Sequence, residues 1–150
     1  MAITTAMCNS FKTEILEGVH DFTASTGNTF KLALIKASPT GTYGAATTNY
    51  SDVTGNSDET SGTGYTAGGV TLTANVTPTN SSNVSYTDWT TDPSWTSASF
   101  SAAGCIIYNS SKSNKAVAVF DFGGTQTVSS GTFTLTLPSA TSSTAILRIS

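Results

Sequence analysis

The feature that most constrains the fold of this chain is a repeated alternation of apolar residues with mostly polar ones. Residues 30–34, 70–76 and 132–137 show it most clearly, and Thr fills many of the polar positions. Successive side chains of a β-strand point to opposite faces of a sheet, so a period of two predicts strands with one buried face. Thr is β-branched and suits the outer face of such a sheet. The chain is therefore predicted to consist mainly of strands.

Further segments bring the predicted total to about eight strands. They are residues 84–87, 97–100, 104–108, 116–122 and 145–149. Turn residues separate the segments, and residues 77–82, which include Pro78, are predicted to form one of the turns. Short strands at this spacing indicate an all-β fold, an antiparallel β-sandwich of jelly-roll-like type.

One segment near the N-terminus has a helical period instead. Its apolar residues fall on one stripe of a helix: Met7, Cys8, Phe11, Ile15 and Leu16. Thr4 or Thr5 can cap this helix and Gly18 can end it, which predicts a helix over about residues 4–17. A helix of this length is marginal alone in water. The stripe therefore has to pack on its own domain or on a neighbouring subunit.

Residues 38–69 form a long Gly/Thr-rich loop with few large apolar side chains, which we call the arm. Long loops within a compact domain are usually functional or mobile. Tyr43, Tyr50 and Tyr65 punctuate the arm and can anchor it by packing. A chain of 150 residues is about one domain. We therefore expect a single domain over residues 1–150, with the sandwich over about residues 28–150.

The charge of the chain excludes one class of partner. Only 10% of the residues are charged and the net charge is −3, whereas nucleic-acid-binding proteins show basic clusters. No apolar run approaches the ~20 residues of a membrane-spanning helix. The N-terminal residues lack the basic region and apolar core of a signal peptide. We expect a protein made in the cytoplasm, with neither nucleic acid nor membrane as a partner.

The residues that could hold a metal are few and scattered. Cys8, Cys105 and His20 give at most three soft ligands, and a structural zinc site needs about four. A disulfide between the two cysteines is compatible with the sequence but not required by it. Residues 52–59 resemble a calcium loop only loosely, because they lack its ligand register and its distal Glu. No metal and no other cofactor is expected.

The inventory of catalytic side chains is equally thin. His20 is the single histidine, and its neighbour Asp21 suggests an acid–base dyad, although adjacent residues rarely face one another. The chain has no Gly-x-Ser-x-Gly elbow that would activate a serine. We therefore expect no enzymatic activity and assign no catalytic residue.

Two tryptophans leave a choice open. Trp89 and Trp95 lie close to Tyr86, Asp88 and Asp92, and aromatic rings beside acids can bind carbohydrate. The other interpretation is that both rings are core or interface anchors around the turn at Pro93. A carbohydrate-binding module is kept as an alternative function.

Four segments resemble a family of small virion structural proteins of tailed bacteriophages. They are residues 4–22 (TTAMCNSFKTEILEGVHDF), 62–72 (GTGYTAGGVTL), 106–124 (IIYNSSKSNKAVAVFDFGG) and 145–150 (AILRIS). The resemblance spans nearly the whole chain and lies in its pattern, not in a catalytic signature. It implies a capsid cement or decoration protein, and it supplies no site residues.

The resemblance sets the functional expectation. It implies a non-enzymatic virion protein, assembled in the host cytoplasm, that binds the major capsid protein lattice at the outer surface and stabilises the head. A tail, neck or head-fibre component is the alternative within the virion. Self-association as a dimer or trimer is expected, because closed symmetry is the rule for such assemblies. The candidate contact residues are Met7, Phe11, Ile15, Tyr43, Tyr50, Tyr65, Trp89 and Trp95.

Overall fold

The computed structural model describes residues 2–150 and contains two antiparallel sheets. The larger sheet has the order β1-β7-β6-β2-β3 and the smaller has the order β4-β5-β8. The strands are β1 (Ala6–Met7), β2 (Phe30–Lys36), β3 (Val70–Thr71), β4 (Asn75–Ser81), β5 (Val84–Trp89), β6 (Ser94–Asn109), β7 (Lys115–Thr134) and β8 (Leu147–Ile149). The helices are α1 (Asn9–Leu16) and α2 (Ser51–Gly55). The predicted all-β, sandwich-like fold with about eight strands is confirmed.

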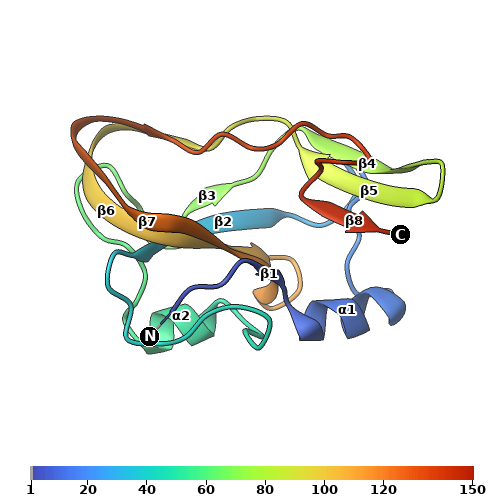
Figure 1. Ribbon diagram of the computed structural model, residues 1–150, viewed down its shortest axis with the longest axis horizontal. Helices are drawn as coiled ribbons and strands as arrows, with labels where there is room; N and C mark the ends of the chain where they lie inside the picture. Colours follow the sequence, from blue (N-terminus) through green and yellow to red (C-terminus); the bar gives the residue numbers. More distant parts are fainter. Residues whose placement is uncertain (1) are drawn as a thin grey trace.

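A long hairpin, β6–β7, builds most of the larger sheet (Figure 1). The two strands curve around one end of the molecule and continue over its top. Their pairing shifts register at four places, including the step between Ala102 and Gly104. Such bulges bend a strand pair without ending it. Four predicted segments, residues 97–100, 104–108, 116–122 and 132–137, therefore fall on two strands, although β7 ends at Thr134.

The prediction was wrong for residues 70–82. Residues 70–76 do not form one strand, because Ala74 adopts a left-handed backbone with a φ of 56° that separates β3 from β4. Residues 77–82 are mostly strand, not turn. Pro78 lies in the edge strand β4, at the register shift between Val76 and Thr79. An edge strand at a shift tolerates a residue that has no N–H to donate.

The helix is shorter than predicted at its start. Ala6 and Met7 form β1 and pair with Ala118 and Val119 of β7. Cys8 then stands at the N-cap position, and its side chain makes no capping hydrogen bond. The predicted stop is confirmed, since Gly18 has a φ of 70° and its N–H donates to the Ile15 carbonyl.

Two aromatic clusters fill the core. In the first, Phe22 stacks on Phe30 with ring centroids 4.4 Å apart, and Trp89 packs against both rings. Since Phe30 belongs to β2 and Trp89 to β5, this cluster joins the two sheets. The second cluster lies along the bent part of the hairpin and comprises Tyr65, Trp95, Phe100 and Phe133. Within residues 2–150, no helix is long and apolar enough to cross a membrane.

Candidate functional site

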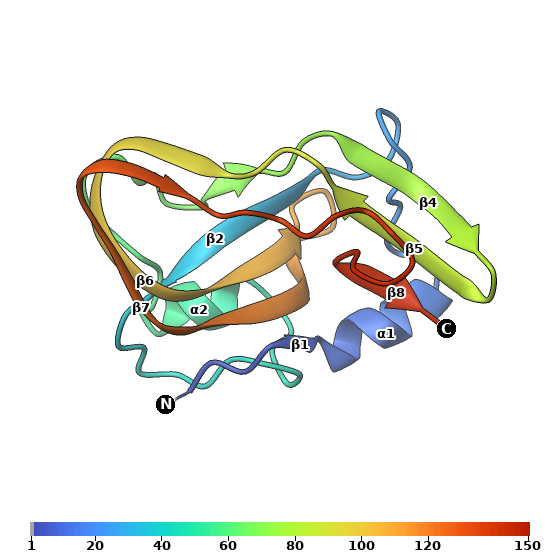
Figure 2. The same cartoon turned by 45° about the horizontal axis from the view of Figure 1, so that its top comes forward.

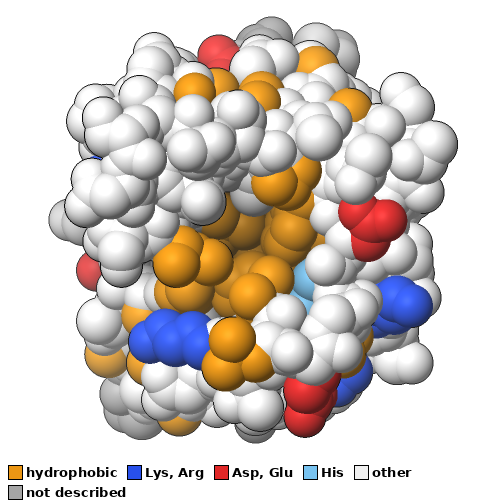
Figure 3. Space-filling model, turned by 90° about the vertical axis from the view of Figure 1, so that its right-hand side faces the viewer, with side chains coloured by type: hydrophobic (Ala, Val, Ile, Leu, Met, Phe, Trp, Pro, Cys, Tyr) orange, Lys and Arg blue, Asp and Glu red, His pale blue; other side chains and the backbone are white. Residues whose placement is uncertain are grey.

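At one end of the sandwich α1 faces the smaller sheet (Figure 2). An apolar groove lies at this end of the molecule (Figure 3). It consists of two adjoining cavities of about 430 and 540 Å³ that share Met7 and Leu147. Apolar side chains of the first cavity include Leu32, Ile107, Phe120, Leu135, Leu137 and Ile146. The second is lined by Met7, Phe11, Ile15, Tyr86, Leu147 and Ile149, together with polar groups such as His20.

The groove stays open because the elements around it are short. β8 has only three residues and pairs with β5 along one edge. α1 contributes one wall with its apolar stripe and β8 contributes the opposite wall. No described strand covers the space between these walls. A concave surface of this size, mostly apolar with few polar groups, is typical of a binding site.

The rim of the groove carries two protruding apolar side chains. Leu16 at the end of α1 is 90% exposed and Ile149 of β8 is 57% exposed. Within residues 2–150 these are the large apolar side chains that are exposed. Ile149 itself lines the second cavity, and Leu16 directly follows Ile15, which lines it too. Hollow and rim thus make one apolar surface, and such surfaces mark interaction sites.

A buried polar network holds α1 behind the groove. His20 Nε2 lies 2.7 Å from Glu14 Oε2, and Lys115 Nζ donates to Glu14 Oε1 at 2.8 Å. On its other side, His20 Nδ1 lies 2.9 Å from the amide nitrogen of Asn109. Asn109 also donates to Asn28 at 2.8 Å. The network ties α1 to the ends of β2, β6 and β7 and so fixes the helical wall of the groove.

Both ring nitrogens of His20 are engaged in this network. The amide nitrogen of Asn109 is a donor, so Nδ1 accepts and Nε2 donates its proton to Glu14. The Asp21 carboxylate accepts the backbone N–H of Thr23 at 2.9 Å, while Glu14 and Asn109 engage the two ring nitrogens of His20. The adjacent His20 and Asp21 therefore form no dyad in this structure.

The pKa values of the network follow from burial and from its hydrogen bonds. Burial lowers the pKa of His20 below its ordinary value and outweighs the opposing effect of the Glu14 carboxylate. Burial alone would raise the pKa of Glu14, but hydrogen bonds from Lys115 and His20 outweigh it and the pKa is lowered. At neutral pH the ionised Glu14 thus lies between a lysine and a neutral histidine.

A titration of His20 tests this arrangement. Because it is the single histidine, its imidazole C2 proton gives one resolved NMR signal. We expect a pKa below the ordinary value of about 6.5. The unfolded chain then binds more protons than the folded chain, so stability falls as the pH decreases below about 6.5. A measured pKa at or above 6.5 would show that the ring is not held neutral by burial.

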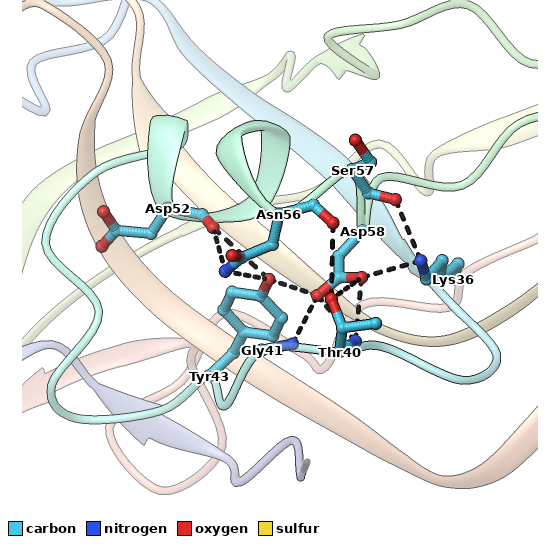
Figure 4. Close-up of polar contacts among 8 residues, drawn as sticks. All are labelled: Lys36, Thr40, Gly41, Tyr43, Asp52, Asn56, Ser57 and Asp58. Carbon is cyan, nitrogen blue, oxygen red and sulfur yellow. Dashed lines mark hydrogen bonds and ion pairs between the residues drawn. The ribbon is translucent and has the colours of Figure 1, made fainter.

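The arm is ordered around the buried carboxylate of Asp58 (Figure 4). Lys36 Nζ lies 2.8 Å from Asp58 Oδ1, and the Tyr43 hydroxyl donates to Oδ2 at 2.6 Å. The backbone N–H groups of Thr40 and Gly41 donate at 2.9 and 2.7 Å, and the Thr40 hydroxyl donates as well. Despite burial, these donors hold the pKa of Asp58 well below its usual range. Asp58 thus pins the start of the arm to β2.

The next residue, Glu59, gathers the other two arm tyrosines. The hydroxyls of Tyr50 and Tyr65 donate to its two carboxylate oxygens at 2.5 and 2.8 Å. The N–H of Gly68 donates to Glu59 at 2.7 Å. Gly69 follows with a φ of +70°, and a side-chain carbon there would overlap the Leu32 carbonyl. The arm closes tightly on β2 and is not an extended contact element.

The structure brings three of the predicted contact residues together and separates the others from them. Met7, Phe11 and Ile15 all line the groove. Their stripe packs against the chain's own core and also borders the open cavity. The structure thus shows the packing of the stripe on its own domain, and its contact with a neighbouring subunit stays a prediction.

The remaining five candidates serve the chain's own packing. Tyr43, Trp89 and Trp95 are buried, and Tyr50 and Tyr65 are half-buried against Glu59. Trp89 is only 1% exposed. This corrects the expectation of a contact surface at Tyr43, Trp89 and Trp95, whereas a contact at the half-buried Tyr50 and Tyr65 stays a prediction. Both indoles are buried, which argues against the carbohydrate-binding alternative.

The cysteines are both free and buried. The Cys8 thiol faces the Gly44 carbonyl, with the sulfur 3.8 Å from the oxygen. Burial raises the pKa of Cys8 to about 12 and also raises the pKa of Cys105. In the part of the chain described, no group of three or more His, Cys, Asp and Glu side chains is placed to hold a metal ion.

Residues of the C-terminal wall escaped the sequence analysis. Leu147, Ile149 and Leu137 were assigned to strands by their alternation, but nothing in that pattern shows that they face α1. A weak signal was present in Leu16 and Ile149, two large apolar residues at the ends of predicted elements.

Comparison of the chain with protein-family models, curated proteins and solved structures finds no match.

Proposed function

We propose that this chain is a non-enzymatic structural protein of a tailed-bacteriophage virion that binds the major capsid protein lattice and stabilises the head. The observation that carries the proposal is the apolar groove with its exposed rim residues, Leu16 and Ile149. The resemblance of four segments to small virion proteins supplies the assembly in which this surface would be used.

The groove favours a protein that works by assembling with other chains. Burying apolar surface contributes roughly 25 cal/mol per Å². A surface that keeps Leu16 and Ile149 in water forgoes this stabilisation until another chain covers it. Repeated copies on a lattice would add the avidity of many such contacts.

The buried polar groups support the same role. Glu14 fixes α1 through Lys115 and His20, so the helical wall of the groove is preorganised. A preorganised surface loses little conformational entropy on binding. Such a protein needs no cofactor to hold its shape in a particle.

Binding to capsid shells tests the proposal. Purified chain would be mixed with empty shells of the major capsid protein of the same virion, and then sedimented with them. We expect saturable binding at a fixed ratio to the capsid subunits. Isolated tails from the same virion serve as the comparison. Binding to tails alone, or to neither structure, would overturn the assignment to the head.

A further inference from the structure

The two walls of the groove carry charges of opposite sign at their ends. On the helical wall, the exposed Leu16 is followed by the acidic Glu17. On the strand wall, the exposed Ile149 lines the second cavity and the basic Arg148 before it lines the first. Each wall thus offers one protruding apolar side chain and one charge, and the charges have opposite sign.

We propose that a second copy of this chain covers the groove in a two-fold symmetric dimer. Leu16 and Glu17 of one copy lie against Arg148 and Ile149 of the other, and the symmetry axis repeats the contact. The inference rests on the proposed function only in taking the groove as a protein contact surface.

The argument for a second copy is self-complementarity. In a two-fold interface the same patch of both copies meets, so a contact between two different elements occurs twice. Such a patch must therefore contain both a hollow and the side chain that fills it. Here the second cavity is the hollow, and Leu16 and Ile149 are the protruding side chains that could enter the cavity of the other copy. An unrelated partner would not need both halves on one chain.

The charges on the rim fit this pairing. Within residues 2–150, neither Glu17 nor Arg148 belongs to an ion pair. The Arg148 guanidinium donates to the Ser143 carbonyl, which leaves its charge uncompensated. Asp21 also lines the second cavity, and its carboxylate already accepts the Thr23 N–H. Facing Glu17 with Arg148 would neutralise both rim charges, whereas a two-fold contact of like groups would not.

Sedimentation velocity over a dilution series measures the oligomer directly. We expect the unmodified chain to sediment as a dimer that dissociates on dilution. Leu16→Glu and Ile149→Glu each place a charge in the apolar contact, and each should give a monomer. Both side chains are exposed, so the monomer fold should survive and its circular dichroism should be unchanged. Thr125→Glu, at an exposed site on β7, is the matched control and should remain a dimer.

Charge reversal tests the predicted pairing. Glu17→Arg and Arg148→Glu each set like charges against each other and should raise the dimer dissociation constant about tenfold at low salt. The double variant restores opposite charges and should restore the dissociation constant. A double variant as weak as the single variants would overturn the Glu17–Arg148 contact.

The two proposals fail in different ways. A chain that is monomeric at all concentrations but still binds shells would overturn the dimer and leave the proposed function intact. A dimer that binds no shell would support this inference and contradict the capsid assignment. A third outcome is an unmodified chain that is monomeric and a Leu16→Glu variant that no longer binds shells. This outcome would overturn the dimer and show that the capsid protein covers the groove.

Discussion

Replacing Asp58 by Ala lowers the free energy of unfolding by about 3–5 kcal/mol, because it breaks a buried ion pair and leaves its donors without an acceptor. The carboxylate is fully buried and receives hydrogen bonds from Thr40, Gly41 and Tyr43 besides the Lys36 ammonium. Urea denaturation followed by circular dichroism measures the change. Tyr43→Phe removes one of the donors and should cost about 1 kcal/mol.

The control for this experiment is Asp121→Ala. Asp121 is exposed, and its carboxylate accepts a single backbone N–H from Gly123. A surface substitution of this kind usually changes stability by no more than about 0.5 kcal/mol. If Asp58→Ala cost as little as Asp121→Ala, the arm would not be held in the way the structure describes.

The same carboxylate predicts how the stability of the folded chain changes at acidic pH. The pKa of Asp58 is lower in the folded chain than in the unfolded chain, where it is about 3.9. The contribution of ionised Asp58 to the free energy of unfolding is therefore complete above the pKa of the unfolded chain. It is lost as the pH falls below that value. Asp58→Ala should consequently lose less stability than the unmodified chain between neutral pH and strongly acidic pH.

Replacing Trp89 by Ala has a comparable effect, about 3–5 kcal/mol, because it empties the contact between the two sheets. Trp89 is 1% exposed and packs on Phe22 and Phe30 with centroid distances of 6.0 and 5.4 Å. Its indole nitrogen has no hydrogen-bond partner among residues 2–150. Trp89→Phe keeps an aromatic ring and removes this unpaired donor, so it should cost clearly less.

Denaturation of both variants separates a packing role from a surface role. Equal and small losses for Trp89→Ala and Trp89→Phe would mean that the ring is not part of the core. Fluorescence gives an independent check, since the buried Trp89 should be poorly quenched by iodide. Strong quenching of both indoles would return the carbohydrate-binding alternative to consideration.

The sequence predicted the elements whose signals are local. The alternation in residues 30–34 and 84–87 lies within β2 and β5, and Gly18 ends α1 as predicted. The bends of β6 and β7 were not predictable, because a bulge interrupts the alternation in the same way as a turn. The prediction of one strand over residues 70–76 failed for the opposite reason. Ala74 continues the apolar alternation, but its left-handed backbone interrupts the strand.

The candidate site was predictable only on its helical side. The stripe of Met7, Phe11 and Ile15 is a local pattern, and its need for a partner surface followed from its length. The opposite wall comes from the other end of the chain, and no spacing rule relates Leu147 to Phe11. The arm escaped prediction for a related reason, because Asp58 finds its partners 15–22 residues away in the sequence.

The central proposal is that this chain is a head protein whose groove is covered by another protein chain. Imaging of the purified virion to which we assign the chain, at a resolution that traces the backbone, tests this proposal most directly. We expect density for the chain on the outer shell, at a fixed ratio to the capsid subunits, with Leu16 and Ile149 buried in a contact. Density confined to the tail or neck, a groove open to solvent, or absence from the particle would contradict the proposal.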